Sequence, residues 1–162
     1  MRKFIFVPIF FIICLLIFNC SAIGLIDCEG SFTYAPNDFT LEEQAWIEES
    51  ASRWNVWVGY TLVKVIPGEQ EACSIVNGFT VNPDAVAEEH EPTYVITIDK
   101  DHLQRLNQLN QKRFEAVVMH ELGHALGYDH ILNGKALMAP SANDDFTDLD
   151  RAECIRHNMC KP

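Results

Sequence analysis

The sequence predicts an α+β fold, in which a twisted, mixed sheet of about four or five strands is backed by two helices and followed by a small C-terminal lobe. Three observations lead to this prediction. Apolar residues recur at helical spacing between Thr40 and Trp57, three segments rich in β-branched and aromatic residues follow, and helical spacing returns after Asp101. The 162 residues, 48% of them hydrophobic, suffice for one domain with one core.

The first twenty-two residues are typical of a signal peptide. Two basic residues precede an apolar run from Phe4 to Phe18, after which small and polar residues follow. The run is shorter than the ~20 residues of a membrane-spanning helix, and Pro8 interrupts it. We therefore expect an exported protein in which residues 1–22 are the leader and residues 23–162 form a single domain.

Cys20 leaves two endings of this leader open. The string LLIFNC resembles a bacterial lipoprotein cleavage box, which would lipidate Cys20 and tie the protein to a membrane. Cleavage after Ala22 by an ordinary signal peptidase would release the protein instead. The predicted location is secreted in one case and a lipid-anchored position in the cell envelope in the other.

The cysteines after the leader predict two disulfides in an oxidising compartment. Three pairings of the four residues are open on sequence alone. A local bridge between the last two requires the helix to end between them, because helical residues six apart lie about 9 Å from each other. The four are Cys28, Cys73, Cys154 and Cys160.

The first predicted helix begins with a capping box, formed by Thr40 and Glu43. Strands are predicted over residues 60–66, 74–81 and 93–99, with another over 32–34, whereas the polar stretch 82–92 predicts a surface loop. Asp101 is the expected cap of the next helical turn. The firmest helix covers residues 112–126 and ends at Gly127, because glycine accepts the left-handed conformation that closes a helix.

This second helix carries the string HELGHALGYDH, from His120 to His130, which matches the pattern HExxHxxGxxH. Two histidines four apart project from one helix face, and a single Zn²⁺ can bridge them. Gly127 permits the turn that brings His130 to the same ion. Three neutral ligands leave one position for water, and Glu121, beside His120, can take a proton from that water.

The string resembles the metzincin clan of zinc peptidases, and the chain that follows is similar to the matrixin family. Residues 136–140, ALMAP, resemble the Met-turn, which implies that Met138 forms a hydrophobic floor under the metal and does not ligate it. Residues 146–153 resemble the entry into the closing helix, capped by Thr147 or Asp148. The resemblance implies a metzincin-like zincin fold for the single catalytic domain, one catalytic Zn²⁺, and a sheet strand beside the cleft that pairs with substrate; residues 74–81 are expected to include it.

Some family features are missing. Fewer than twenty residues separate the leader from the first helix, so we expect no matrixin-type propeptide, and Cys28 lacks the motif of a latency thiol. Structural calcium is compatible with the family, but the sequence lacks the set of His and Asp residues that would indicate it.

We expect His90, His102 and His157 on the surface. Tyr128 is expected to pack, and the tryptophans of the first helix to join the core: Trp46, Trp54 and Trp57.

Charge narrows the range of partners. Without Arg2 and Lys3 the chain has 10 basic and 23 acidic residues, a net charge of −13, which argues against a nucleic-acid partner. The sequence therefore predicts a monomeric zinc endopeptidase that acts on proteins or peptides and touches membrane only through lipidation of Cys20. The alternative is a catalytically inactive zinc-binding module that holds a partner protein. Intact Glu121 favours catalysis, because a dead site has no need for the base.

Overall fold

The computed structural model describes residues 28–69, 72–141 and 143–160. The predicted leader, including Cys20 and the cleavage site after Ala22, lies outside these residues. Within the described part of the chain, no helix is both long and apolar enough to cross a membrane.

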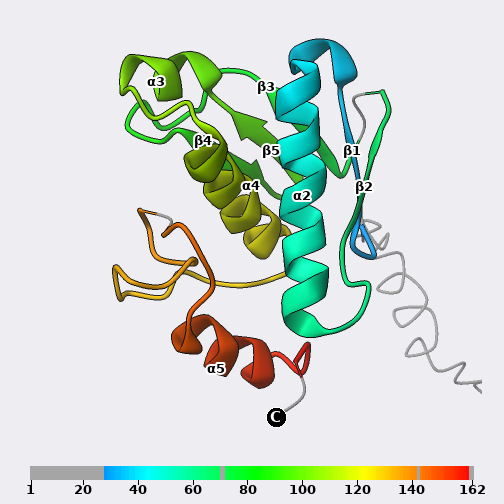
Figure 1. Ribbon diagram of the computed structural model, residues 1–162, viewed down its shortest axis with the longest axis vertical. Helices are drawn as coiled ribbons and strands as arrows, with labels where there is room; N and C mark the ends of the chain where they lie inside the picture. The colour runs from blue at the N-terminus through cyan, green and yellow to red at the C-terminus, as the bar shows by residue number, and fades with distance from the viewer. Residues whose placement is uncertain (1–27, 70–71, 142, 161–162) are drawn as a thin grey trace, which may run out of the picture.

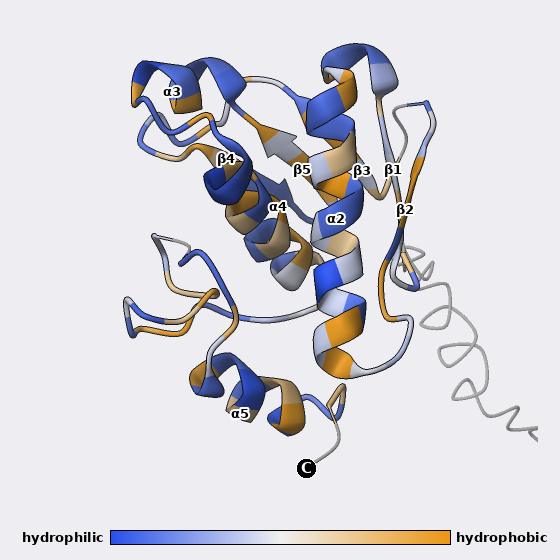
Figure 2. Ribbon diagram, in the orientation of Figure 1, coloured by the Kyte–Doolittle hydropathy of each residue, from blue (hydrophilic) through white to orange (hydrophobic). Residues whose placement is uncertain are grey.

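The fold is α+β, as predicted, and has a five-stranded mixed sheet. Helices α2 and α4 lie side by side against one face of the sheet, and α5 lies below them near the C-terminus (Figure 1). Apolar residues on the helices alternate with polar ones, as expected for helices with one face on the core (Figure 2). The elements in chain order are β1 (Ser31–Tyr34), η1 (Pro36–Asp38), α2 (Leu41–Val58), β2 (Lys64–Pro67), β3 (Ser74–Asn77), β4 (Ala87–His90), β5 (Val95–Ile98), α3 (Lys100–Arg105), α4 (Gln111–Ala125) and α5 (Asp148–Arg156).

The strands follow the order β2-β1-β3-β5-β4. All neighbouring pairs are parallel except β4 and β5, which form an antiparallel pair. Two expectations were wrong here. Residues 82–92 contain β4 and are not wholly a loop. The segment 74–81 is a strand only to Asn77 and lies inside the sheet, so its backbone groups are already paired and it cannot receive a substrate strand.

Strand β2 begins later than predicted. The side chain of Asn55 on α2 accepts hydrogen bonds from the backbone N–H groups of Leu62 and Val63, at 2.7 and 2.8 Å. Its amide also donates to the carbonyl of Val63. Because these backbone groups bond to a helix side chain, they do not join the sheet, and the ladder starts at Lys64.

Helix α2 confirms the predicted capping box. Thr40 accepts a hydrogen bond from the N–H of Glu43, and the Glu43 carboxylate accepts one from the N–H of Thr40 at 2.7 Å. Trp54 is fully buried and its indole N–H donates to the carbonyl of Met119 on α4 at 3.0 Å, which ties the two helices together. Trp46 and Trp57 are partly buried against the same core, as expected.

The cap of α3 differs from the prediction. The side chain of Asp99, not Asp101, accepts the N–H of His102 at 2.7 Å, and Asp101 lies in the first turn. Both residues are acidic and two positions apart, so the sequence pattern did not separate them. The cap of α5 is confirmed, because Thr147 forms a capping box with Asp150.

Both disulfides are present in the described structure, and the three open pairings are resolved as Cys28–Cys73 and Cys154–Cys160. The first joins the residues that precede β1 and β3, so Cys28 is not a latency thiol. The second closes a short loop, because α5 ends at Arg156 and Asn158 takes a left-handed conformation with φ of 59°. The helix ends between the two cysteines, as such a bridge requires.

We expect the two disulfides to contribute unequally to stability. Chain entropy predicts about 4 kcal/mol for a loop of separation 45 and about 2.4 kcal/mol for one of separation 6. The double variant Cys28→Ser/Cys73→Ser should therefore unfold at a lower urea concentration than Cys154→Ser/Cys160→Ser, with wild type above both. Equal midpoints for the two variants would contradict the loop-length argument.

Candidate metal centre

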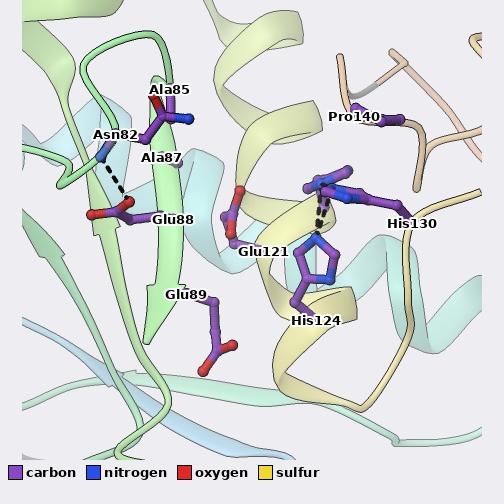
Figure 3. Close-up of a pocket in the computed structure, with 10 residues that line it drawn as sticks. Asn82, Ala85, Ala87, Glu88, Glu89, Glu121, His124, His130 and Pro140 are labelled. Carbon is purple, nitrogen blue, oxygen red and sulfur yellow. Dashed lines mark hydrogen bonds between the residues drawn. The ribbon is translucent and has the colours of Figure 1, made fainter. Parts of the chain in front are cut away.

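Two histidines lie on one face of helix α4 because they are four residues apart. Asn110 caps the helix by accepting the N–H of Arg113 at 3.1 Å. Phe114, Val118 and Leu122 are fully buried and hold α4 against α2 and the sheet. His120 and His124 lie one turn apart, and both line the cleft. Figure 3 shows the position of His124.

The chain reverses directly after this helix and brings a third histidine back. Gly127 has φ of 88°, a left-handed conformation that favours glycine, and its N–H donates to the carbonyl of His124 at 2.7 Å. The N–H of Tyr128 donates to Gly123, and its ring is 2% exposed, so it packs as expected. Two residues later His130 arrives beside the helix.

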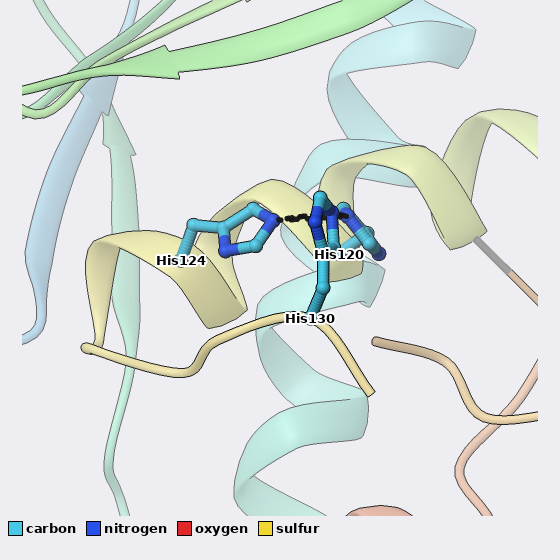
Figure 4. Close-up of side chains that lie close together, drawn as sticks. All are labelled: His120, His124 and His130. Carbon is cyan, nitrogen blue, oxygen red and sulfur yellow. Dashed lines mark hydrogen bonds between the residues drawn. The ribbon is translucent and has the colours of Figure 1, made fainter. Parts of the chain in front are cut away.

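The three imidazoles converge through their Nε2 atoms (Figure 4). These atoms are 3.0 Å apart between His120 and His124, and 3.2 Å apart between His130 and each of the other two. They form the only group of three or more metal-ligating side chains among the described residues. The structure thus brings together all three histidines that the motif singled out.

The other ring nitrogens show that these contacts are not ordinary hydrogen bonds. Nδ1 of His120 lies 2.8 Å from the carbonyl of Leu137, and Nδ1 of His124 lies 2.7 Å from the carbonyl of Tyr128. Since a carbonyl only accepts, both Nδ1 atoms carry the proton and both Nε2 atoms present lone pairs. Two lone pairs that face each other at 3.0 Å repel unless a cation lies between them.

The donor set fits Zn²⁺. Tetrahedral zinc with bonds of about 2.1 Å to nitrogen requires N···N separations of about 3.4 Å, close to the observed values. Burial lowers the pKa of His120 to about 4 and also lowers the pKa of His124, so both rings are neutral at pH 7, as ligands must be. The carbonyls that bond Nδ1 fix the tautomer and the ring orientation.

The methionine of the predicted Met-turn, Met138, packs against the helix that carries His120 and His124. Its side chain is fully buried and packs on Gly123, where an added Cβ would collide with the Met138 sulfur. The adjacent Leu137 supplies the carbonyl that orients His120. The backbone carbonyl of Met138 accepts the N–H of Ile131 at 2.8 Å, which connects this turn to the segment that carries His130.

Glu121 lies beside the histidines in a cavity of about 400 Å³ (Figure 3). It is 7% exposed. Burial, and to a smaller extent the carboxylates of Glu89 and Glu88, raises the pKa of Glu121 to about 8, although a hydrogen bond from the backbone of Glu89 lowers it. Burial and the neighbouring Glu91 likewise raise the pKa of Glu89. A cation bound by the histidines would lower the pKa of Glu121 and so favour the carboxylate form of its side chain.

Sequence reasoning missed the wall of the cavity opposite the helix. That wall is the edge strand β4, through Ala87, Glu88 and Glu89. The segment AEEH lacks the β-branched residues that indicate a strand, and it is extended only because β5 pairs with it. The only hint of this strand in the sequence was that its residues lie between the turn signal at Asn82-Pro83 and the next predicted strand.

A known protein family matches most of the chain. The family model described as matrixin matches residues 39–153, which include α2, strands β2 to β5, the histidine cluster and most of α5. The chain belongs to the matrixin family. Matrixins are zinc metallopeptidases of the metzincin clan, so the family implies a bound zinc ion.

This matrixin also has a likeness among solved structures. It is similar to high choriolytic enzyme 1, a hatching-enzyme zinc protease from medaka fish (Oryzias latipes), with 20% identity and a TM-score of 0.40. The match covers 62% of this chain and 44% of that protein, so the chain spans less than half of its length. No curated protein matches the chain.

The remaining described histidines of this matrixin lie outside the cluster. His90 on β4 contacts Glu88 at 3.2 Å, and Nδ1 of His102 bonds the carbonyl of Ala85 at 3.0 Å. His157 contacts Glu153 and stacks near Tyr128. All three are half-buried, not fully on the surface as expected, and none joins a second group of metal-ligating side chains in the described residues.

Proposed function

We propose that this matrixin is a zinc-dependent endopeptidase, with His120, His124 and His130 as the zinc ligands and Glu121 as general base. The observation that carries the proposal is the convergence of three Nε2 atoms within 3.2 Å, with the lone pairs of His120 and His124 facing each other at the floor of the cleft. A bound Zn²⁺ would supply a Lewis acid that lowers the pKa of water to about 7 and polarises the scissile carbonyl.

Glu121 is the proton carrier in this proposal. Its carboxylate lies in the same cavity as the histidines and is one residue from His120. It accepts a proton from the attacking water and passes that proton to the amine of the leaving peptide. Met138 beneath the cluster and the Leu137 carbonyl beside His120 hold the ligands in place.

Strand β4 is the proposed binding edge for substrate. The N–H of Asp99 donates to the carbonyl of Val86, so residues 86, 88 and 90 face β5 in the hydrogen-bonding alternation of an antiparallel pair. The backbone groups of Ala87 and Glu89 therefore point away from β5. The N–H of Glu89 bonds the Glu121 side chain, so an extended peptide can pair with Ala87 and with the carbonyl of Glu89. This pairing along the middle of a chain favours an endopeptidase.

Two disulfides among the described residues indicate an oxidising, extracytoplasmic setting. We propose that residues 1–22 are a signal peptide and that residues 23–162 are a single, monomeric catalytic domain. Intact-mass measurement of the protein from its native host separates the two endings of the leader. A mass that starts at Ile23 indicates secretion, and a diacylated mass that starts at Cys20 indicates a lipoprotein.

The proposed function is tested by metal content together with cleavage. Purified protein should contain about one zinc per chain by mass spectrometry, cleave a denatured protein, stop on addition of a chelator and recover with added zinc. His124→Ala should lose both zinc and cleavage, whereas the matched control His102→Ala should keep both. Zinc without cleavage of any substrate would leave the inactive binding module as the better description.

A further inference from the structure

Acidic side chains gather around the cleft beside the histidine cluster. The cavity at the cluster includes Glu88, Glu89 and Glu121, and a second cavity of about 280 Å³, which shares His124, includes Glu29 and Glu91. Neither lining contains a lysine or an arginine. The net charge of the chain is −11, so a cationic group would be attracted to this cleft from a distance.

Glu89 differs from its neighbours in its bonding. Glu88 contacts His90 and accepts hydrogen bonds from the backbone of Val81 and Asn82. The Oε1 atom of Glu89, in contrast, is buried without a hydrogen-bond partner in the described structure. A buried carboxylate oxygen without a hydrogen-bond donor destabilises the folded protein. A ligand that binds in the cleft can supply the missing donor.

Glu89 lies where a ligand bound beside β4 can contact it. Alternation along β4 puts Ala87 and Glu89 on one side of the strand and Glu88 and His90 on the other. Figure 3 shows the Glu89 carboxylate pointing away from that of Glu88, in the region between β4 and His124. Both the carbonyl of Glu89, on the outer edge of β4, and its side chain can thus contact a strand that pairs there.

We propose that Glu89 selects peptide substrates that carry a lysine or arginine close to the scissile bond. The inference rests on the proposed function, because it takes the substrate to be an extended peptide on β4. Side chains on paired strands lie about 4.5–5.5 Å apart between Cβ atoms, so a long cationic side chain opposite Glu89 reaches its carboxylate. A free metal ion is the weaker partner, since only the histidines form a group of three ligands in the described chain.

The test compares peptides that differ by one charge. A fluorogenic peptide is made with Lys, Gln or Glu in turn at each of three positions on either side of the cleaved bond. At one position wild type should cleave the Lys peptide with a kcat/KM about tenfold or more above the Gln peptide, as expected for a charge-assisted hydrogen bond. Glu89→Gln should bring that ratio near one, and Glu89→Lys should favour the Glu peptide.

Glu88→Gln is the matched control. It removes the same charge one residue away, on the opposite side of β4, and should keep the preference for Lys. Loss of the preference in Glu88→Gln and Glu89→Gln alike would indicate a diffuse charge effect and overturn the role of Glu89. Equal cleavage of Lys, Gln and Glu peptides by wild type at every position would overturn the inference while leaving the endopeptidase proposal intact.

A binding measurement tests this inference independently of the proposed cleavage. In the Glu121→Gln background, fluorescence polarisation measures Kd for labelled Lys and Glu peptides without cleavage. Tighter binding of the Lys peptide, lost on adding Glu89→Gln, supports the inference even if wild type cleaves nothing and the endopeptidase proposal fails. Equal Kd values for the two peptides count against it.

Discussion

Glu121→Gln should reduce cleavage by about 10²–10⁴-fold and leave bound zinc unchanged. The amide has nearly the same shape as the carboxylate but cannot take a proton from water. His120 and His124, two of the proposed ligands, keep their partners, because the carbonyls of Leu137 and Tyr128 orient them independently of Glu121. Loss of kcat with an unchanged zinc content is the expected signature.

The variant should also fold at least as well as wild type. Glu121 is 7% exposed, and burial together with Glu88 and Glu89 disfavours its charged form. Replacement by a neutral amide removes that cost, so thermal unfolding should shift upward or stay the same. A buried carboxyl group that opposes folding is best explained by a role in catalysis. The unfolding measurement therefore also tests the alternative of an inactive zinc-binding module.

Glu115→Gln is the matched control on the same helix. Glu115 is also buried, at 6% exposure, but its carboxylate pairs with Arg53 at 3.1 Å and does not line the cavity. This variant should lose stability and keep its turnover, the opposite pattern from Glu121→Gln. A drop in turnover that follows unfolding in both variants would remove the case for Glu121 as general base.

The sequence predicted those parts of the molecule that local chemistry determines. The capping box at Thr40 and the glycine turn at Gly127 each depend on residues within a few positions of one another. The ligand positions likewise follow from the 3.6-residue period of one helix and a single reversal of the chain. Such features are set by backbone sterics and short-range hydrogen bonds, so a single sequence is enough.

The sequence could not predict what depends on distant partners. Strand β4 has no strand-like composition and is extended because β5 lies beside it. The start of β2 is set by Asn55, on a helix that precedes it. The disulfide pairing follows from the placement of β1 beside β3, which local sequence does not encode. As a result, the convergence of the three histidines was predicted, but the edge strand beside the cavity was not.

Asp150→Ala should be the most damaging single change outside the histidine cluster. The carboxylate is 1% exposed and accepts hydrogen bonds from the N–H groups of Leu137, Met138 and Thr147, at 3.0, 3.1 and 2.8 Å, and from the Thr147 hydroxyl at 2.7 Å. Removing it leaves buried donors without acceptors, each costing about 1–3 kcal/mol. We expect a loss of at least about 3 kcal/mol in the free energy of unfolding.

The same change should weaken zinc binding although Asp150 does not touch the metal site. Its carboxylate holds Leu137, whose carbonyl orients His120, and Met138, whose carbonyl bonds the segment leading from His130. Loss of such a supporting contact typically costs about 10–100-fold in metal affinity. Competition with a chromogenic chelator, at a temperature where the variant is folded, measures this effect separately from stability.

Asp148→Asn provides the comparison for this prediction. Asp148 is exposed in the first turn of α5, two residues before Asp150, and makes no contact with the turn at Leu137 and Met138 among those described. It should change stability by less than about 1 kcal/mol, through the helix dipole alone, and leave zinc affinity as it is. If Asp150→Ala retained wild-type zinc affinity while losing stability, α5 would support the fold without positioning the ligands, and the link from the closing helix to His120 would be wrong.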